Sequence, residues 1–227
     1  MSKKHIKKQT QQQQQVKQYK KDGSFHLEFL NAEQKAAYDL YQKNDIIFLL
    51  GPAGSGKTHL AAGFGIASIL TKEKSRLVLS RPIVEAGEKL GYLPGTFEEK
   101  IAPYLIPLMH CFDDLVGKDS LNREFINKNL EFLPIAYCRG VTFKNCIAVL
   151  DEAQNATKTQ IKLFLTRLGM NAKVIITGDP YQTDIGQNSG LMEVVESLKD
   201  VNGIGIMQFS EKAIVRHPLI PEILKRV

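Results

Sequence analysis

The segment "GPAGSGKT", residues 51–58, has the residue types and spacing of a phosphate-binding loop. Gly51, Gly56, Lys57 and Thr58 match a glycine, four residues, then glycine, lysine and a hydroxyl residue. In such a loop, backbone N–H groups surround the phosphates, the lysine reaches the β- and γ-phosphates, and the threonine holds Mg²⁺. The alternative is an ordinary glycine turn before a helix. The expected nucleotide contacts are Gly51, Pro52, Ala53, Gly54, Ser55, Gly56, Lys57, Thr58 and His59.

Two adjacent carboxylates follow an apolar run in "CIAVLDEAQN", residues 146–155. Asp151 suits a magnesium ligand, together with Thr58. Glu152 suits a catalytic role, because a carboxylate beside the metal ligand can orient or deprotonate a water for attack on the γ-phosphate. The pair therefore predicts hydrolysis. For a single carboxylate the alternative is an acidic helix N-terminus, which the helix dipole attracts.

Gln182 occupies a similar position after the next strand, in "VIITGDPYQTD". Its amide both donates and accepts hydrogen bonds, so it suits a residue that senses the γ-phosphate or aligns the attacking water. The alternative is a turn built from Gly178, Asp179 and Pro180 with an incidental glutamine. The residues alone leave both interpretations open.

Strands and helices alternate along most of the chain. Short apolar runs predict strands at 45–50, 75–80, 130–137, 146–150, 172–178 and 204–210. Helical patterns cover 30–44, 58–70, 97–116, 121–130 and 157–169. The helix at 157–169 begins with a capping arrangement of Thr157 and Gln160. This alternation predicts an α/β fold with a mostly parallel sheet flanked by helices, and a ligand at the carboxyl ends of the strands.

The net charge of +6 comes from the N-terminal segment. Residues 1–21 carry seven lysines and no acid, whereas the rest of the chain has 23 basic and 24 acidic side chains. We expect residues 1–24 to be a basic, glutamine-rich disordered tail, and 25–227 to form one domain. The tail either attracts nucleic-acid phosphates or only aids solubility.

Apolar runs and cysteines point to a cytoplasmic protein. No apolar run approaches the roughly 18 residues that a membrane helix needs, and no apolar segment of a signal peptide follows the first lysines. Cys111, Cys138 and Cys146 lack the spacing of metal ligands, which favours buried free thiols in a reducing compartment.

These motifs, with "SRPIVEAGEKLGYLPGTFEEKIAPYLIPL" and "EKAIVRHPLI", resemble the PhoH-like family of ATPases over residues 30–220. That family is similar to a superfamily 1 helicase core reduced to one RecA-like P-loop NTPase domain. The resemblance implies ATP at the loop with Lys57, Mg²⁺ at Thr58 and Asp151, catalysis by Glu152 and a sensor at Gln182.

Gln34 in "LNAEQ" matches the position where related helicases contact adenine. A capping box with Asn31 at the helix N-cap is the competing explanation.

Arg216 in "AIVRHP" is the candidate arginine finger, which would neutralise charge in the transition state. Two-domain helicases supply this residue from a second domain, so here it would act on a neighbouring subunit of a head-to-tail ring. Analogy with other ring ATPases favours a hexamer. The alternative is a surface arginine before the helix-starting Pro218.

The loop at 81–95 follows a strand near the phosphate site, where helicases contact single strands. Arg81, Lys89 and Tyr92 suit phosphate pairing and base stacking, and Arg139 is a second basic candidate. Packing between subunits is the alternative for this loop. The leading hypothesis is a homo-oligomeric ring ATPase that moves along or unwinds single-stranded nucleic acid, with RNA favoured over DNA. The second is a nucleotide-switched assembly or binding protein without translocation.

Overall fold

The structure is a computed structural model that describes residues 27–83, 106, 108–115, 124, 128–215 and 226. The predicted tail and three predicted site residues, Lys89, Tyr92 and Arg216, lie outside these residues.

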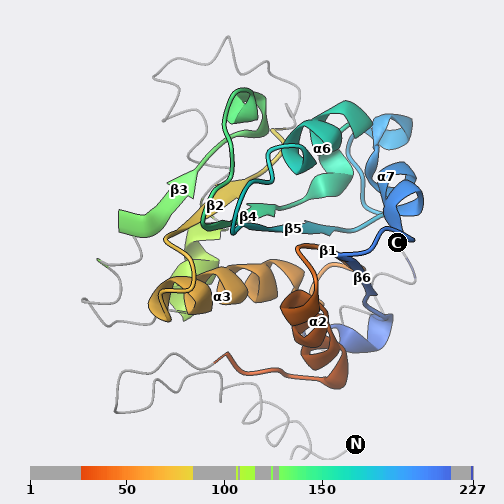
Figure 1. Cartoon of the computed structure of the whole chain (residues 1–227). Coiled ribbons are helices and arrows are strands. Elements are labelled where there is room, and N and C mark those ends of the chain that lie inside the picture. The colour runs from red at the N-terminus through yellow and green to blue at the C-terminus, as the bar shows by residue number, and fades with distance from the viewer. Residues whose placement is uncertain are drawn as a thin grey trace, which may run out of the picture.

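Six strands form one parallel sheet, as predicted (Figure 1). Across the sheet they run β3 (Leu130–Phe132), β2 (Arg76–Ser80), β4 (Cys146–Leu150), β5 (Lys173–Gly178), β1 (Ile46–Leu50) and β6 (Ile204–Gln208). All neighbouring strands are parallel, so their carboxyl ends meet at one edge of the sheet. Because β5 lies between β1 and β4, the strand before the phosphate loop and the strand before Asp151 are not adjacent.

Helices cover both faces of the sheet (Figure 1). One face carries α2 (Ala32–Lys43) and α3 (Lys57–Leu70), and the other carries α6 (Lys158–Leu165) and α7 (Leu191–Leu198). Short 3₁₀ turns complete the connections at η2 (Ile135–Cys138), η3 (Ala153–Asn155), η4 (Gly186–Asn188) and η5 (Glu211–Ala213).

Alternating side chains of β1 divide the core into two layers. Ile47 and Leu49 pack with Phe64 in the cluster beneath α2 and α3. Phe48 and Leu50 pack in the second cluster, beneath α6 and α7. This period of two explains why an apolar run without polar residues becomes a central strand, since both of its faces are covered.

The start of α2 differs in one detail from the predicted capping box. Asn31 caps the helix, and its Oδ1 accepts the N–H of Gln34 at 2.9 Å. The Gln34 side chain, however, accepts the N–H of Leu30 at 2.8 Å instead of that of Asn31. The predicted capping box of Thr157 and Gln160 is present at α6.

The predicted strand at 130–137 is shorter in the structure. It ends at Phe132, and the chain turns at Pro134 into the 3₁₀ turn η2. Proline has no N–H to donate to a neighbouring strand, which explains the early end. In the segments predicted as helices at 97–116 and 121–130, the described residues 106, 108–115, 124 and 128–129 are helical.

Candidate functional site

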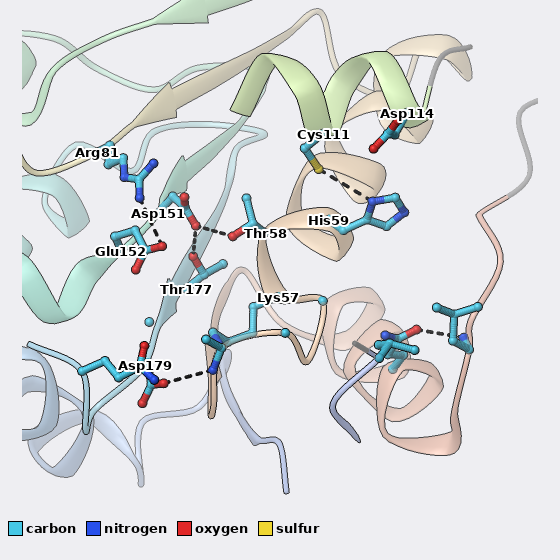
Figure 2. Close-up of a pocket in the computed structure, with 18 of the residues that line it drawn as sticks. Lys57, Thr58, His59, Arg81, Cys111, Asp114, Asp151, Glu152, Thr177 and Asp179 are labelled. Atoms are coloured by element: carbon cyan, nitrogen blue, oxygen red, sulfur yellow. Dashed lines mark hydrogen bonds and ion pairs between the residues drawn. The ribbon is translucent and has the colours of Figure 1, made fainter. Parts of the chain in front are cut away.

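A cavity of about 620 Å³ lies at the carboxyl ends of β1, β2, β4 and β5 (Figure 2). The predicted site residues that line it are Gln34, Ala53, Gly54, Gly56, Lys57, Thr58, His59, Arg81, Asp151, Glu152 and Gln182. The fold therefore brings residues from five separate sequence segments to one place. The sequence predicts no ligand contact for the other lining residues, which are Glu28, Leu30, Cys111, Asp114, Thr177, Gly178, Asp179 and Val215.

The loop between β1 and α3 turns on its glycines. Gly54 and Gly56 have φ angles of 88° and 86°, which residues with a Cβ rarely adopt. A Cβ on Gly56 would also lie 2.8 Å from Nε2 of Gln34. The N–H groups of Gly54 and Gly56 have no hydrogen-bond partner within the described part of the chain, so they remain available to phosphate oxygens.

The Lys57 side chain is bound to its own loop. Its Nζ donates to the carbonyl oxygens of Gly51 at 2.7 Å and Pro52 at 2.9 Å. A triphosphate that enters the loop offers this ammonium group a charged acceptor in place of two neutral ones, and hydrogen bonds between charged partners are the stronger kind.

Three oxygen atoms converge beside the loop. The hydroxyl of Thr58 donates to Oδ1 of Asp151 at 2.7 Å, and the hydroxyl of Thr177 donates to the same oxygen at 2.5 Å (Figure 2). Asp151 is only 3% exposed. A buried carboxylate with adjacent hydroxyls is the hard oxygen donor set that Mg²⁺ prefers, so Thr58 and Asp151 fit the predicted magnesium ligands.

Glu152 is held on both of its carboxylate oxygens, and Figure 2 shows the contact with Arg81. Arg81 Nη2 lies 3.2 Å from Oε1, and Gln154 Nε2 donates to Oε2 at 2.5 Å. The backbone of Glu152 is left-handed, with φ 54° and ψ 43°. Few residues other than glycine and asparagine adopt this conformation, and strained backbone of this kind concentrates at functional sites.

Gln154 and Asp179 connect Glu152 to the phosphate loop. Oε1 of Gln154 accepts the N–H of Asp179 at 3.0 Å, and Oδ2 of Asp179 accepts the N–H of Ala53 at 3.1 Å. Both residues are buried. The sequence predicts only a turn for Asp179 and no role for Gln154, although both lie within the segments that contain Gln182 and Glu152. Their polarity in a buried position was the missing signal.

Gln34 joins α2 to the phosphate loop. Its Nε2 donates to the carbonyl oxygen of Ser55 at 3.2 Å, while its Oε1 accepts the N–H of Leu30. A carboxamide has two donor hydrogens and two acceptor lone pairs, so one of each remains for a ligand. The role predicted for Gln34 at adenine therefore stays compatible with its position in the cavity lining.

His59 faces the helical segment 108–115 across the cavity. Its Nδ1 lies 3.7 Å from the Cys111 sulfur (Figure 2). Burial lowers the pKa of His59, and nearby Asp114 acts in the opposite direction. Burial also raises the pKa of the Cys111 thiol to about 12. This side of the cavity therefore favours a neutral imidazole and a protonated thiol at neutral pH.

Of two other predicted residues, Gln182 lies at the cavity and Arg139 does not. Gln182 is exposed at the cavity rim, where its N–H donates to the carbonyl of Asp179 at 3.2 Å. Arg139 is exposed after η2 and does not line the cavity. Val215, which precedes Arg216 in the chain, donates its N–H to the carbonyl of Gly54 at 2.9 Å.

The three cysteines are free thiols that differ in burial. Cys138 and Cys146 are buried free thiols, and Cys111 is half-buried. Among the described residues, no helix combines the length and apolar character needed to cross a membrane.

A structural likeness shows the fold. The large terminase of a thermophilic bacteriophage, solved in complex with ADP, superimposes with a TM-score of 0.54 at 13% sequence identity, covering 86% of this chain and 49% of the terminase chain. The likeness supports the α/β fold and carries no conclusion about activity.

Comparison of the sequence with known proteins identifies the family. The PhoH-like protein of Mycobacterium bovis is 45% identical over 193 residues, which are 84% of this chain and 55% of that protein. The PhoH-like protein of Bacillus subtilis is 44% identical over 186 residues, which are 81% of this chain and 58% of that protein. The chain thus spans a little more than half the length of these relatives. A model of the family "PhoH-like protein" matches residues 26–227, and the chain therefore belongs to the PhoH-like family of P-loop proteins.

Proposed function

We propose that this chain hydrolyses ATP in the cavity at the carboxyl ends of its strands. The observation that carries the proposal is the position of Glu152. It follows Asp151 directly and lines the same cavity as Lys57 and Thr58. A carboxylate there supplies what a phosphate-binding loop alone lacks, which is a group that acts on the attacking water.

Binding of the triphosphate would use the loop and the start of α3. The N–H groups of Gly54 and Gly56 would take phosphate oxygens, and the positive end of the α3 dipole favours the negative charge. Lys57 would leave the carbonyls of Gly51 and Pro52 for the β- and γ-phosphates. Gln34 would contact adenine with its remaining donor and acceptor.

Thr58 and Asp151 would hold Mg²⁺. When bound, the ion neutralises phosphate charge and keeps the β- and γ-phosphates in one orientation. Thr177 donates a hydrogen bond to the same oxygen of Asp151 and so keeps this carboxylate aimed at the cavity.

In the reaction, Glu152 orients a water and accepts one of its protons as the water oxygen bonds to the γ-phosphorus. The bond from that phosphorus to the bridging oxygen breaks, and its electron pair stays on the β-phosphate of ADP. Lys57 stabilises the charge that develops on the phosphates. Gln182, at the rim of the cavity, would align the water or sense the γ-phosphate.

We further propose that hydrolysis drives movement on single-stranded nucleic acid, RNA in preference to DNA. The support is the placement of Arg81, which begins the predicted strand-binding loop and lies directly beside Glu152. A strand on this loop would thus bind next to the catalytic carboxylate.

We also propose that Arg216, which lies outside the described residues, is an arginine finger that acts on the nucleotide of a neighbouring subunit in a ring. The alternative is an arginine that acts within its own chain. Whether Arg216 acts within its own chain or on a neighbouring subunit, Arg216→Ala should lose hydrolysis. Mixing Arg216→Ala with Glu152→Gln distinguishes the two: activity returns only if the arginine acts across subunits.

The central test is Glu152→Gln in the full chain. We expect this variant to bind a fluorescent ATP analogue as tightly as the wild type while its kcat falls about 10²- to 10⁴-fold, the usual contribution of a general base. Glu196→Gln, which removes an exposed carboxylate paired with Lys199 on α7, is the matched control and should keep full activity. Turnover retained in Glu152→Gln would contradict the role of Glu152 as the general base.

A further inference from the structure

Arg81 lies close to Asp151 and Glu152 in space, although it is 70 positions from Asp151 along the chain. It directly follows β2, whose last residue Ser80 is in register with Leu150 on β4. The carbonyl of Ser80 accepts the N–H of Asp151 at 2.9 Å. The two strand ends therefore keep Arg81 within reach of Glu152, and its guanidinium lies 3.2 Å from Oε1 (Figure 2).

The two groups that hold Glu152 differ in how deeply they are buried. Gln154 is 3% exposed and is fixed by its bond to Asp179 in the interior. The Arg81 side chain is 22% exposed and the Glu152 side chain 37% exposed, so a ligand can reach their ion pair from the cavity. Of the two restraints on the carboxylate, the one from Arg81 is therefore the more easily displaced.

We propose that Arg81 is a positioning residue that restrains Glu152 until a backbone phosphate of a single-stranded nucleic acid takes its guanidinium. The proposal rests on the proposed function of the cavity. An arginine forms the same forked pair of hydrogen bonds with a phosphate as with a carboxylate. Partly exposed ion pairs are weak in water, so a strand phosphate can replace Glu152 as the partner.

Once a strand phosphate has taken the Arg81 guanidinium, Glu152 keeps one of its two restraints. Gln154 still binds Oε2, while Oε1 can approach a water in the cavity. Strand binding then favours the arrangement that hydrolyses ATP. By linkage, the arrangement with Arg81 turned away from Glu152 favours strand binding in turn. A coupling role for Arg81 therefore predicts a change in strand affinity, which a merely structural role would not.

The test compares Arg81→Gln with Arg76→Gln in the full chain. Arg76 lies at the other end of β2 and forms a similar pair with Glu131 at 2.8 Å, away from the cavity. For each protein we would measure kcat and KM for ATP, with and without saturating oligo(U) RNA.

In the wild type we expect stimulation of kcat by oligo(U) of at least about fivefold, the usual lower range of coupling between sites. In Arg81→Gln we expect the unstimulated kcat to rise about threefold or more, and stimulation to fall below about twofold, with little change in KM. Arg81→Lys, which keeps a single point charge, should fall between the two. Arg76→Gln should match the wild type.

A binding measurement distinguishes the strand phosphate from the γ-phosphate of ATP as the competing ligand. Fluorescence anisotropy of labelled oligo(U), with ADP present, should show weaker binding to Arg81→Gln than to the wild type and Arg76→Gln. Unchanged strand affinity with weakened binding of a non-hydrolysable ATP analogue would overturn the proposal in favour of the γ-phosphate.

Other outcomes separate this proposal from the proposed function. A lower unstimulated kcat in both Arg81→Gln and Arg81→Lys, with wild-type stimulation, would overturn the restraint while leaving hydrolysis intact. Wild-type hydrolysis that no strand stimulates would have the same effect. Absence of hydrolysis in the wild type under all conditions would overturn the proposed function itself.

Discussion

The two ends of the parallel sheet contain similar polar residues arranged in opposite ways. At the amino end, Lys74 donates to Asn171, and Asn171 donates from its side chain to Asn145 at 2.6 Å, so these groups bind one another. At the carboxyl end, Lys57 and Glu152 are bound to the protein but also line a cavity. The amino end is therefore complete without a ligand, whereas the carboxyl end can exchange its contacts for those of a ligand.

Residues with left-handed backbone occur at both ends of the sheet. Asn145 and Asn171 have φ angles of 49° and 54° in the turns before β4 and β5. Asparagine adopts this conformation at little cost. Glu152 has the same φ of 54° after β4, where a glutamate costs more. Lys72, in the turn between α3 and β2, also has a φ of 61°. Strain of this kind therefore occurs at both ends of the sheet, and at the carboxyl end it falls on the proposed catalytic carboxylate.

Among variants that compare the two ends of the sheet, the lysines should differ most. Lys57→Ala should lower kcat/KM for ATP about 10²- to 10³-fold, as loss of one preorganised charged donor does in other enzymes. Lys74→Ala should leave kcat/KM unchanged and cost at most about 1 kcal/mol of unfolding free energy, because its partners are exposed. Steady-state hydrolysis and thermal unfolding of both variants measure this. Equal loss of activity in the two would remove the functional distinction between the ends.

A smaller effect is expected at Gln154. Gln154→Ala removes the amide that holds Glu152 and leaves the buried N–H of Asp179 without its acceptor. We expect kcat to fall about tenfold to 10²-fold from misplacement of Glu152. The free energy of unfolding should fall by about 1–3 kcal/mol from the unsatisfied N–H.

Gln154→Glu provides the control, because it keeps the acceptor for Asp179 but places a second carboxylate beside Glu152. It should recover much of the stability in urea denaturation without recovering kcat. Recovery of both would show that Gln154 acts only on stability.

The smallest effect is expected at the amino end. Asn145→Ala puts a Cβ-bearing residue without a local polar group at φ 49°. The penalty of about 1 kcal/mol for this conformation corresponds to a fall in Tm of about 2–4 °C for a domain of this size. Asn145→Gly, which adopts this φ freely, should lose less, and both should hydrolyse ATP like the wild type. A larger loss in the glycine variant would contradict the strain argument.

The sequence was sufficient for the parallel sheet and for the phosphate loop because both depend on local patterns. Apolar runs such as 46–50 can only be buried strands here, and the glycines around Lys57 have few other uses. The contact of Arg81 with Glu152 could not be predicted, because it joins residues 71 positions apart through the register of β2 and β4. Sequence alone placed Arg81 only in a strand-binding loop.

Buried polar residues were the other gap. Thr177 and Asp179 were read as part of a strand and a turn, since nothing local distinguishes a buried threonine or aspartate from an exposed one. Their roles follow from the position of β5 between β1 and β4, which brings them against Asp151 and Ala53. Strand order is a property of the whole chain, so the periodicity of one segment does not reveal it.

The most direct test of the account is steady-state ATP hydrolysis by the full chain at physiological salt, with and without single-stranded RNA and DNA. We expect magnesium-dependent hydrolysis that single strands stimulate, RNA more than DNA. Hydrolysis that is indifferent to both strands would favour a nucleotide-switched assembly over a translocase. Absence of hydrolysis with every strand would contradict the central claim that Glu152 and the phosphate loop form a hydrolytic site.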